Sequence, residues 1–285
     1  MHERYSPYQF TTFRILFGLY LALQFAELIP YSDELFGGSA YSLVKAGLQP
    51  LPNLLIYFER PAEFLIVLVL LSVLFAAGCF RRPASLLIWY GMYCLYHRNV
   101  RIDNVGLAYT GWLLLACTLV PTGEPLRVGR RYQSQWEMPR LLLVSAWTVL
   151  AVSYAVAGVT KLTANLWTDG RLLGYVLESA MARDWWLDRW LLRLPGGIPA
   201  FLTWSVVAAE LSFLPLCLFR PTRFFAWLVL TLMNLGIIFT LDFAQLTIGI
   251  LLFHLFVFDT QWFCRCLNSA GGTGKGVRNA SRQRE

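Results

Sequence analysis

The 285-residue chain is 57% hydrophobic and only 14% charged, with a mean hydropathy of +0.52. Soluble domains carry about a quarter of their residues as charges, so these values exclude an ordinary water-soluble domain. Lys45, Lys161 and Lys275 are the only lysines among 24 Lys plus Arg, so the net charge of +7 comes mainly from arginine. This pattern favours basic cytoplasmic loops over nucleic-acid binding, and we expect the lipid bilayer as the main partner.

Eight apolar runs recur along the chain, at residues 10–30, 61–79, 84–96, 105–121, 140–159, 198–219, 224–241 and 243–258. A helix needs about 20 residues to cross a bilayer. The runs therefore predict an all-α fold, a polytopic integral membrane helical bundle with about eight transmembrane helices. The third run is short and only Asp242 separates the last two, so the number can change by one.

The arginines also predict an orientation. With the N-terminus in the cytoplasm, the cytoplasmic ends hold Arg81, Arg82, Arg127, Arg130, Arg131, Arg140, Arg220, Arg223 and the basic tail, whereas the opposite ends hold fewer. Cytoplasmic loops of membrane proteins carry an excess of Lys and Arg. We therefore expect a multi-pass protein of the cell membrane with cytoplasmic N- and C-termini, and with loops 32–60, 98–104 and 160–197 on the other side.

The loop at 160–197 carries apolar residues at helical spacing between 172 and 181, and Trp185, Trp186 and Trp190 follow. Tryptophan prefers the headgroup region because its ring is apolar and its N–H is polar. The pattern predicts an interfacial Trp-rich helix, and an anchoring role is favoured over a substrate cage.

The C-terminal segment 268–285 is rich in Gly, Ser, Asn and Arg. It has too little apolar surface to fold, so we expect a disordered basic cytoplasmic tail. Just before it, Cys264 and Cys266 form a C-x-C pair without further Cys or His ligands nearby, which argues against a metal site; palmitoylation is the better minority interpretation.

Ionisable residues at membrane depth are functional candidates because burying a charge in lipid is costly. In or beside the apolar runs these are Arg14, Glu63, Lys161, Glu210, Asp242 and His254. A pairing of Arg14 with Glu210 inside the bundle explains both charges as well as a chemical role does. A lone histidine on an apolar helix is more often a hydrogen-bonded interhelical residue than a ligand, which is our interpretation of His254.

Lys161 follows Ala157, Gly158 and Val159, small residues that let another helix come close. A desolvated lysine can hold a neutral amine and act as a general base, whereas a solvated lysine stays charged and acts only as an anchor. The sequence leaves both possibilities open.

The segment YAVAGVTKLTANLWTDG at 154–170 resembles the signature of the vitamin K-dependent gamma-glutamyl carboxylases and of their bacterial relatives, the HTTM (horizontally transferred transmembrane) domains. Further matches in the same order are Phe13, Arg14, Gly18, Arg98, Asn99, Asp103, Asn104, Pro121, Glu210, Pro215, Thr222 and Arg223. Together they cover residues 8–260, which we expect to form an HTTM-like transmembrane domain.

The resemblance implies a chemistry for this region. In the carboxylases the matching lysine deprotonates vitamin K hydroquinone, so Lys161 would be the base, with Asn104 and Glu210 as catalytic polar partners. Trp167, Asp169 and Gly170 would shape the loop that binds vitamin K hydroquinone or another membrane quinol. Val105 departs from the family, because the carboxylases carry a functional histidine there.

Two functions remain open at this stage, and whether the protein is an enzyme remains open with them. The first is quinol epoxidation or carboxylase-like chemistry with Lys161 as base. The second is a non-enzymatic membrane protein that binds a lipid, a peptide or a partner membrane protein, with Lys161 as an anion anchor. A transporter has the least support, because no inverted repeat is evident.

Overall fold

The structure, a computed structural model, describes residues 5–38, 50–126, 133, 135–195, 197–242, 244–259 and 262. Over these residues the fold is all-α, and the sole β-type pairing among them is an isolated bridge between Ala182 and Leu241. The predictions for Cys264, Cys266 and the tail at 268–285 lie outside the described residues.

Each of the eight apolar runs contains a helix, which confirms the all-α prediction. They are α1 (Pro7–Leu28), α3 (Pro61–Ala76), α4 (Arg81–Arg98), α5 (Val105–Leu119), α6 (Arg140–Lys161), α10 (Gly197–Leu218), α11 (Arg220–Thr240) and α12 (Ala244–Val257). Four segments of the described chain are long and apolar enough to cross a membrane: Pro7–Phe36, which contains α1, and helices α6, α10 and α11. Helices α3 and α5 and the segment Thr247–Val257 are shorter apolar helices.

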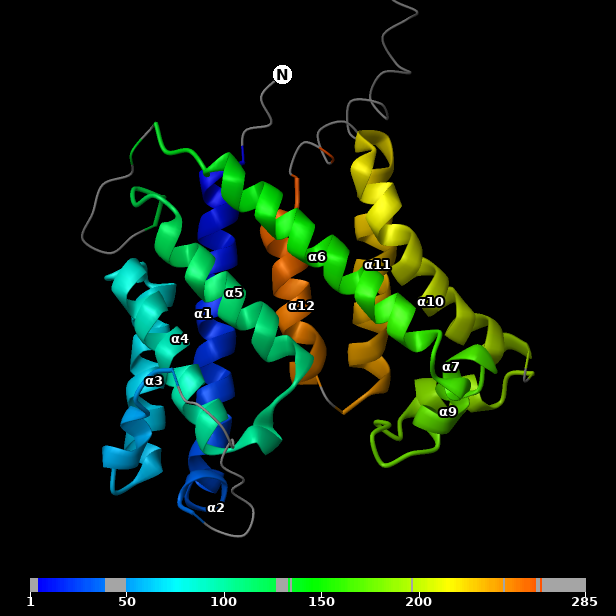
Figure 1. Cartoon of the computed structure of the whole chain (residues 1–285), viewed down its shortest axis with the longest axis horizontal. Helices are drawn as coiled ribbons and strands as arrows, with labels where there is room; N and C mark the ends of the chain where they lie inside the picture. The colour runs from blue at the N-terminus through cyan, green and yellow to red at the C-terminus, as the bar shows by residue number, and fades with distance from the viewer. Residues whose placement is uncertain are drawn as a thin grey trace, which may run out of the picture.

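Small residues set the closest helix contacts. A Cβ on Gly18 of α1 would lie 2.6 Å from Ala76 Cβ of α3, so these two helices pack with their backbones close together. A Cβ on Gly249 of α12 would lie 2.7 Å from the backbone oxygen of Gly106 on α5. Helix α12 packs against α1, α5, α6 and α11, and Figure 1 shows it between α1 and α11.

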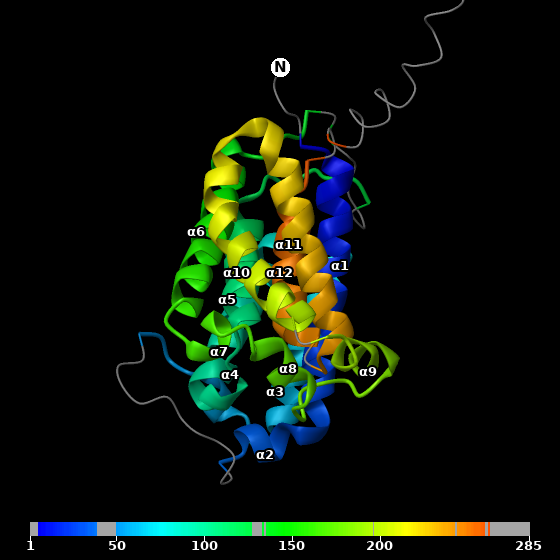
Figure 2. The same cartoon turned by 90° about the vertical axis from the view of Figure 1, so that its right-hand side faces the viewer.

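The short helices gather at one end of the bundle. They are α2 (Ser32–Phe36), α7 (Asn165–Thr168), α8 (Leu172–Leu177) and α9 (Trp186–Leu192). The 3₁₀ turns η1 (Ile29–Tyr31), η2 (Leu54–Tyr57) and η3 (Val100–Ile102) lie between α1 and α2, between α2 and α3, and between α4 and α5. Figures 1 and 2 show α2 and α7 to α9 at the end opposite the N-terminus and the α10–α11 turn. The expected interfacial helix is divided into α8 and α9, because the backbone turns at Asp184, where φ is +48°.

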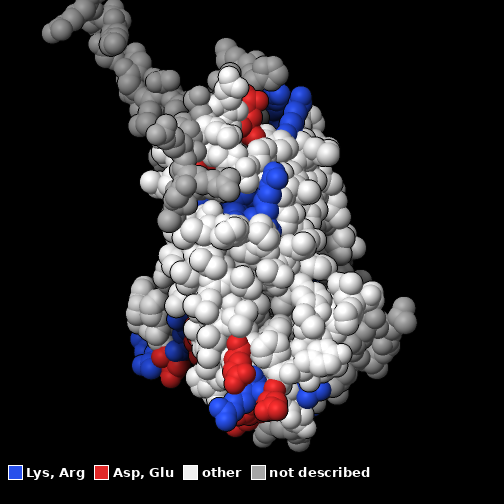
Figure 3. Space-filling model, turned by 90° about the vertical axis from the view of Figure 1, so that its left-hand side faces the viewer, with Lys and Arg blue, Asp and Glu red and all other residues white. Residues whose placement is uncertain are grey.

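The outer surface suits contact with lipid. Large apolar side chains on several helices point outward, among them Leu23 (64% exposed), Leu70 (59%) and Leu232 (57%). The space-filling view shows charged side chains at both ends of the molecule with an uncharged band between them (Figure 3). An apolar band between two charged rims is what a bilayer requires.

The suggested pairing of Arg14 with Glu210 is wrong. Arg14 Nη1 lies 3.0 Å from Glu124 Oε1, and Arg81 Nε lies 2.9 Å from the same oxygen, with all three side chains fully buried. Arg81 also donates to the backbone oxygens of Val120 and Pro121 (2.9 and 2.8 Å), which satisfies carbonyls at the C-terminus of α5. This cluster joins α1 and α4 to the C-terminus of α5. It lies at the end of the bundle opposite α7 to α9 (Figure 1).

Candidate functional site

Helices α6 and α10 approach most closely where α6 carries a glycine. A Cβ on Gly158 would lie 2.9 Å from the Leu211 side chain and 3.1 Å from its backbone nitrogen. Lys161 follows Gly158 by about one helical turn, and Glu210 precedes Leu211, so the close approach brings the two ionisable side chains together.

Lys161 and Glu210 form an ion pair at this crossing. Lys161 Nζ donates to both carboxylate oxygens of Glu210. The Lys161 side chain is 18% exposed and that of Glu210 is 5% exposed. Lys161 Nζ also lies 4.7 Å from the ring centroid of Trp167 on α7, within the range of a cation–π interaction. The lysine is therefore held beside a polar partner and next to a tryptophan, at the end of the bundle that carries α7 to α9.

The other expected site residues surround this pair to different degrees. Asp169 pairs with Arg171 (Oδ2 to Nη2, 2.5 Å) on the surface rather than with Lys161. Gly170 adopts a φ of +70°, which favours glycine, directly after the α7 turn. Asn104 precedes α5, and its Nδ2 lies 3.5 Å from the Ile102 backbone oxygen. The structure thus brings Lys161, Glu210 and Trp167 together and places Gly170 beside them, whereas the described contacts of Asn104 and Asp169 are with other residues.

A buried polar layer lies deeper in the bundle, where α6, α11 and α12 meet. Tyr154 Oη lies 2.8 Å from His254 Nε2 and 2.8 Å from Asn234 Nδ2, and Thr231 Oγ1 lies 2.8 Å from His254 Nδ1. All three residues are buried: His254 and Asn234 are each 1% exposed, and Tyr154 is 4% exposed. These contacts are of the kind we expected for His254, namely hydrogen bonds between helices.

The hydrogen bonds of this layer determine the tautomer of His254. Thr231 Oγ1 lies 2.7 Å from the Trp227 backbone oxygen, which can only accept, so the single Thr231 hydroxyl proton points there. His254 Nδ1 must then donate to Thr231, which leaves Nε2 as the acceptor of the Tyr154 hydroxyl proton. Asn234 Nδ2 donates to both Tyr154 Oη and the Leu230 oxygen (2.8 Å each). With these directions, every hydrogen bond in the network has one donor and one acceptor.

Helix α10, which carries Glu210, also contacts the polar layer. Phe213, one turn after Glu210 on α10, packs edge-to-face against Tyr154 with ring centroids 5.1 Å apart. The Phe213 ring therefore lies between the stretch of α10 that carries the ion pair and the buried polar layer.

The segment around α9 contains one buried carboxyl group. Asp188 is 2% exposed, although its neighbours Trp186 and Trp190 are 68% and 54% exposed. Burial raises the pKa of Asp188 above its ordinary value of 3.8. The exposed tryptophans fit the interfacial role expected for this segment.

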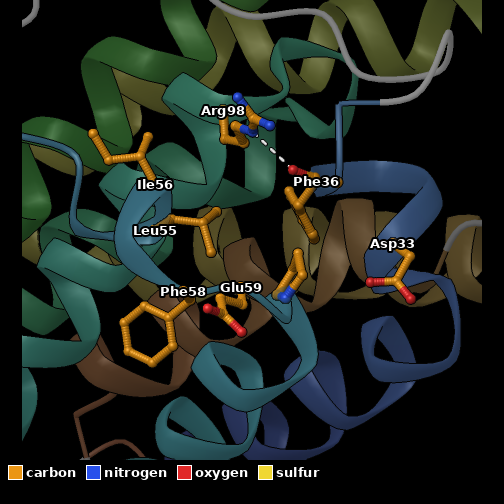
Figure 4. Close-up of a pocket in the computed structure, with 9 residues that line it drawn as sticks. Asp33, Phe36, Leu55, Ile56, Phe58, Glu59 and Arg98 are labelled. Atoms are coloured by element: carbon orange, nitrogen blue, oxygen red, sulfur yellow. Dashed lines mark hydrogen bonds between the residues drawn. The ribbon is translucent and has the colours of Figure 1, made fainter.

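The end of the bundle also contains a cavity of about 340 Å³ between α2, η2 and the end of α4, lined among others by Asp33, Phe36, Leu55, Glu59 and Arg98. Arg98 Nε donates to the Phe36 backbone oxygen at 2.7 Å (Figure 4). A neighbouring cavity of about 490 Å³ is lined by residues that include His97 and Arg98. Neither lining includes Lys161 or Glu210. In the part of the chain that the structure describes, no group of three or more His, Cys, Asp or Glu side chains could hold a metal ion.

Several residues that contact the expected site residues were not predictable from the sequence. Glu124 lies in a Pro- and Gly-containing loop outside the apolar runs, so nothing in the pattern predicted its burial. Thr231 and Asn234 look like ordinary polar residues of α11, and only their placement opposite His254 makes them part of a network. Trp204 is exposed on α10, yet its Nε1 donates to Thr168 O of the α7 turn at 3.1 Å.

Over the residues that the structure describes, fold and site define an all-α protein with four helices that could cross a membrane and a partly buried Lys–Glu pair at one end of the bundle. No family model matches the chain, and neither a curated protein nor a solved structure matches it.

Proposed function

We propose that this chain is a multi-pass membrane protein in which Lys161 takes a proton from a hydroxyl group of a membrane quinol. The observation that carries the proposal is that Lys161 Nζ is bonded to both oxygens of Glu210 while Trp167 lies over it. The resemblance of residues 154–170 to the vitamin K-dependent carboxylases and HTTM domains supports the same assignment.

In this proposal all eight apolar helices lie within the cell membrane, and both termini are cytoplasmic. Helices α3 and α5 have 16 and 15 residues, which suits a short or locally thinned span. The arginine-rich cluster around Arg14 and Arg81 then lies at the cytoplasmic end. Lys161 lies at the opposite, non-cytoplasmic end, near the headgroups and within reach of a lipid-soluble ligand.

The pair gives Lys161 a way to act as a base. One proton shared by Lys161 and Glu210 gives either an ammonium with a carboxylate or an amine with a carboxylic acid. A low-dielectric surrounding penalises the charged arrangement, so the neutral one becomes accessible. The neutral amine then accepts the quinol proton: the O–H bond breaks, its electron pair stays on the quinol oxygen, and the new ammonium stabilises the resulting anion.

The residues around Lys161 fit an aromatic diol carried in the bilayer. The Trp167 indole offers a flat aromatic surface beside the amine, against which a second ring can stack. Val159 and Leu162, which flank Lys161, are 55% and 53% exposed, so an apolar surface leads from the lipid to the pair. Asn104 would act only if the ligand bridges it to Lys161, because its described hydrogen bond is to Ile102.

A second function is favoured by one feature of the same geometry. The Glu210 carboxylate stabilises the ammonium form of Lys161, and an ammonium has three donors, so its remaining N–H could bind an anionic headgroup or an acidic group of a peptide or partner membrane protein. This non-enzymatic alternative requires no proton transfer, and it predicts binding without turnover.

The test is oxygen-dependent epoxidation of vitamin K hydroquinone by the purified protein in detergent. We expect epoxide from the wild type, loss of epoxide in Lys161→Ala and retention in Trp190→Phe, an exposed position on α9 with no described contact to the pair. A well-folded wild type that makes no epoxide would exclude the vitamin K version and favour the binding function.

A further inference from the structure

The α7 turn is fastened to α10 by two contacts that the motif resemblance does not include. Trp204 Nε1 of α10 donates to the Thr168 backbone oxygen at 3.1 Å. A Cβ on Gly170 would lie 2.8 Å from Ala200 Cβ and 3.1 Å from Trp204 Cε2, so the turn lies directly against α10. Both contacts lie within three residues of Trp167.

Hydrogen bonds within the turn link these contacts to Trp167. Trp167 N donates to Ala164 O at 3.0 Å, and Gly170 N donates to Trp167 O at 3.1 Å. The backbone around Trp167 is therefore fixed on both sides, and the indole cannot leave Lys161 through a movement of the whole turn unless the contact with Trp204 breaks.

We propose that Trp204 and Gly170 are positioning residues that hold Trp167 as a cover over Lys161. The ligand reaches the amine when the α7 turn separates from Trp204 and the indole moves aside. The role of the ligand rests on the proposed function, whereas the positioning of the cover does not.

The surroundings of Trp204 suit a releasable contact. Trp204 is 50% exposed, so its indole sits at the surface of the bundle rather than in a packed core. A single hydrogen bond adds little net stability, because the separated groups can bond to water instead, so an arriving ligand can offset its loss. Lys161 itself is 18% exposed, so its side chain lies at the edge of the bundle, within reach of the surface.

The low lysine content makes Lys161 directly observable. Lys45→Arg with Lys275→Arg leaves Lys161 as the only lysine and keeps the net charge. In this single-lysine protein, ¹³Cε-labelled lysine gives one NMR signal, whose shift reports whether an aromatic ring lies over the amine. The rate of acylation at Lys161, measured by mass spectrometry of the peptide that contains it so that the N-terminal amine does not contribute, reports access to the same atom.

The decisive variant is Trp204→Phe in the single-lysine protein, which keeps an aromatic ring against Gly170 and removes the N–H donor. We expect the Lys161 signal to move toward its position in Trp167→Leu and the acylation rate to rise severalfold. Gly170→Ala should act in the same direction through the other contact. Trp190→Phe is the matched control, and it should change neither quantity.

The result that would overturn the proposal is a Lys161 signal and acylation rate unchanged in both Trp204→Phe and Gly170→Ala, while Trp167→Leu changes them. A purely structural role of Trp204 would lower the melting temperature without moving the Lys161 signal in the folded protein. No quinol is present in these measurements, so their outcome is independent of the epoxidation assay.

Discussion

Lys161, the last residue of α6, donates to both carboxylate oxygens of Glu210 in the middle of α10. The two residues are 49 positions apart, so the pair joins two helices rather than stabilising one. The chain between them contains α7, α8 and α9, so the pair connects the two long helices that flank this segment.

The pair should contribute to stability through direct coupling. Glu210→Gln leaves a partly buried ammonium without its carboxylate and should lower the free energy of unfolding by about 1–3 kcal/mol, less than for a fully buried pair. A double-mutant cycle with Lys161→Met, measured by unfolding in mixed micelles, should show coupling of about 1 kcal/mol or more. Asp169→Asn breaks the exposed pair with Arg171 and should cost less than about 1 kcal/mol. Additive effects of Glu210→Gln and Lys161→Met would contradict the observed contact.

The sequence predicted the helices well, but it predicted few of the side-chain contacts between them. Each apolar run contains a helix, and these helices were predictable because the length and hydrophobicity of a run can be read directly from the sequence. The close helix approach beside Lys161 was predictable from Gly158, and the structure has it. The pairing of Arg14 was wrong, because which charges meet inside a bundle depends on helix order and rotation, and Glu124 carries no local sign of burial. The link between Tyr154 and His254 likewise spans 100 residues.

The cluster of Arg14, Arg81 and Glu124 at the opposite end of the bundle should lose more stability on substitution than the Lys161–Glu210 pair. Glu124→Gln removes the carboxylate from two fully buried guanidinium groups, those of Arg14 and Arg81. Loss of one partner from a buried ion pair costs about 3–5 kcal/mol, and we expect a loss of this size in detergent unfolding. Glu137→Gln, at an exposed position, should change stability by less than about 0.5 kcal/mol. Similar effects of both substitutions would contradict the described cluster.

The hydrogen-bond chain predicts the Nδ1–H tautomer of His254. Nitrogen-15 NMR of histidine-labelled protein should show this form, assigned with His254→Gln among the three histidines of the chain. Tyr154→Phe removes the donor to Nε2 and should cost about 1–3 kcal/mol, because a buried acceptor is left unsatisfied. Tyr175→Phe, at a residue that is 61% exposed, is the control. An Nε2–H tautomer would refute the direction we assigned to the chain.

The contact between α1 and α3 depends on the absence of a side chain at Gly18. Gly18→Ala places a Cβ 2.6 Å from Ala76 Cβ and 2.9 Å from Ala76 backbone atoms, so the helices must separate. We expect a loss of about 1–3 kcal/mol in unfolding measurements. Gly236→Ala, where no atom lies within 4 Å of the added Cβ, should be neutral or stabilise by about 0.5–1 kcal/mol. Equal behaviour of the two variants would contradict the packing.

The buried Asp188 in α9 should make the free energy of unfolding depend on pH. Because burial raises its pKa in the folded protein, the folded state binds the proton more tightly than the unfolded chain. This contribution to stability is complete below the ordinary pKa of 3.8 and is lost as the pH rises through the raised value. Asp188→Asn should therefore gain stability relative to the wild type over that rise, whereas Asp184→Asn, at an 83% exposed side chain, should not. A constant difference between Asp188→Asn and wild type across this range would contradict the burial.

The most direct test of the central claim is a titration of the single-lysine protein with vitamin K hydroquinone under anaerobic conditions, followed through the ¹³Cε signal of Lys161. We predict a saturable shift of this signal, and its loss when a matched apolar lipid without hydroxyl groups replaces the quinol. A Lys161 signal that stays unchanged up to saturating quinol, in protein whose fold is intact, would contradict the assignment of the Lys161–Glu210 pair as the quinol site.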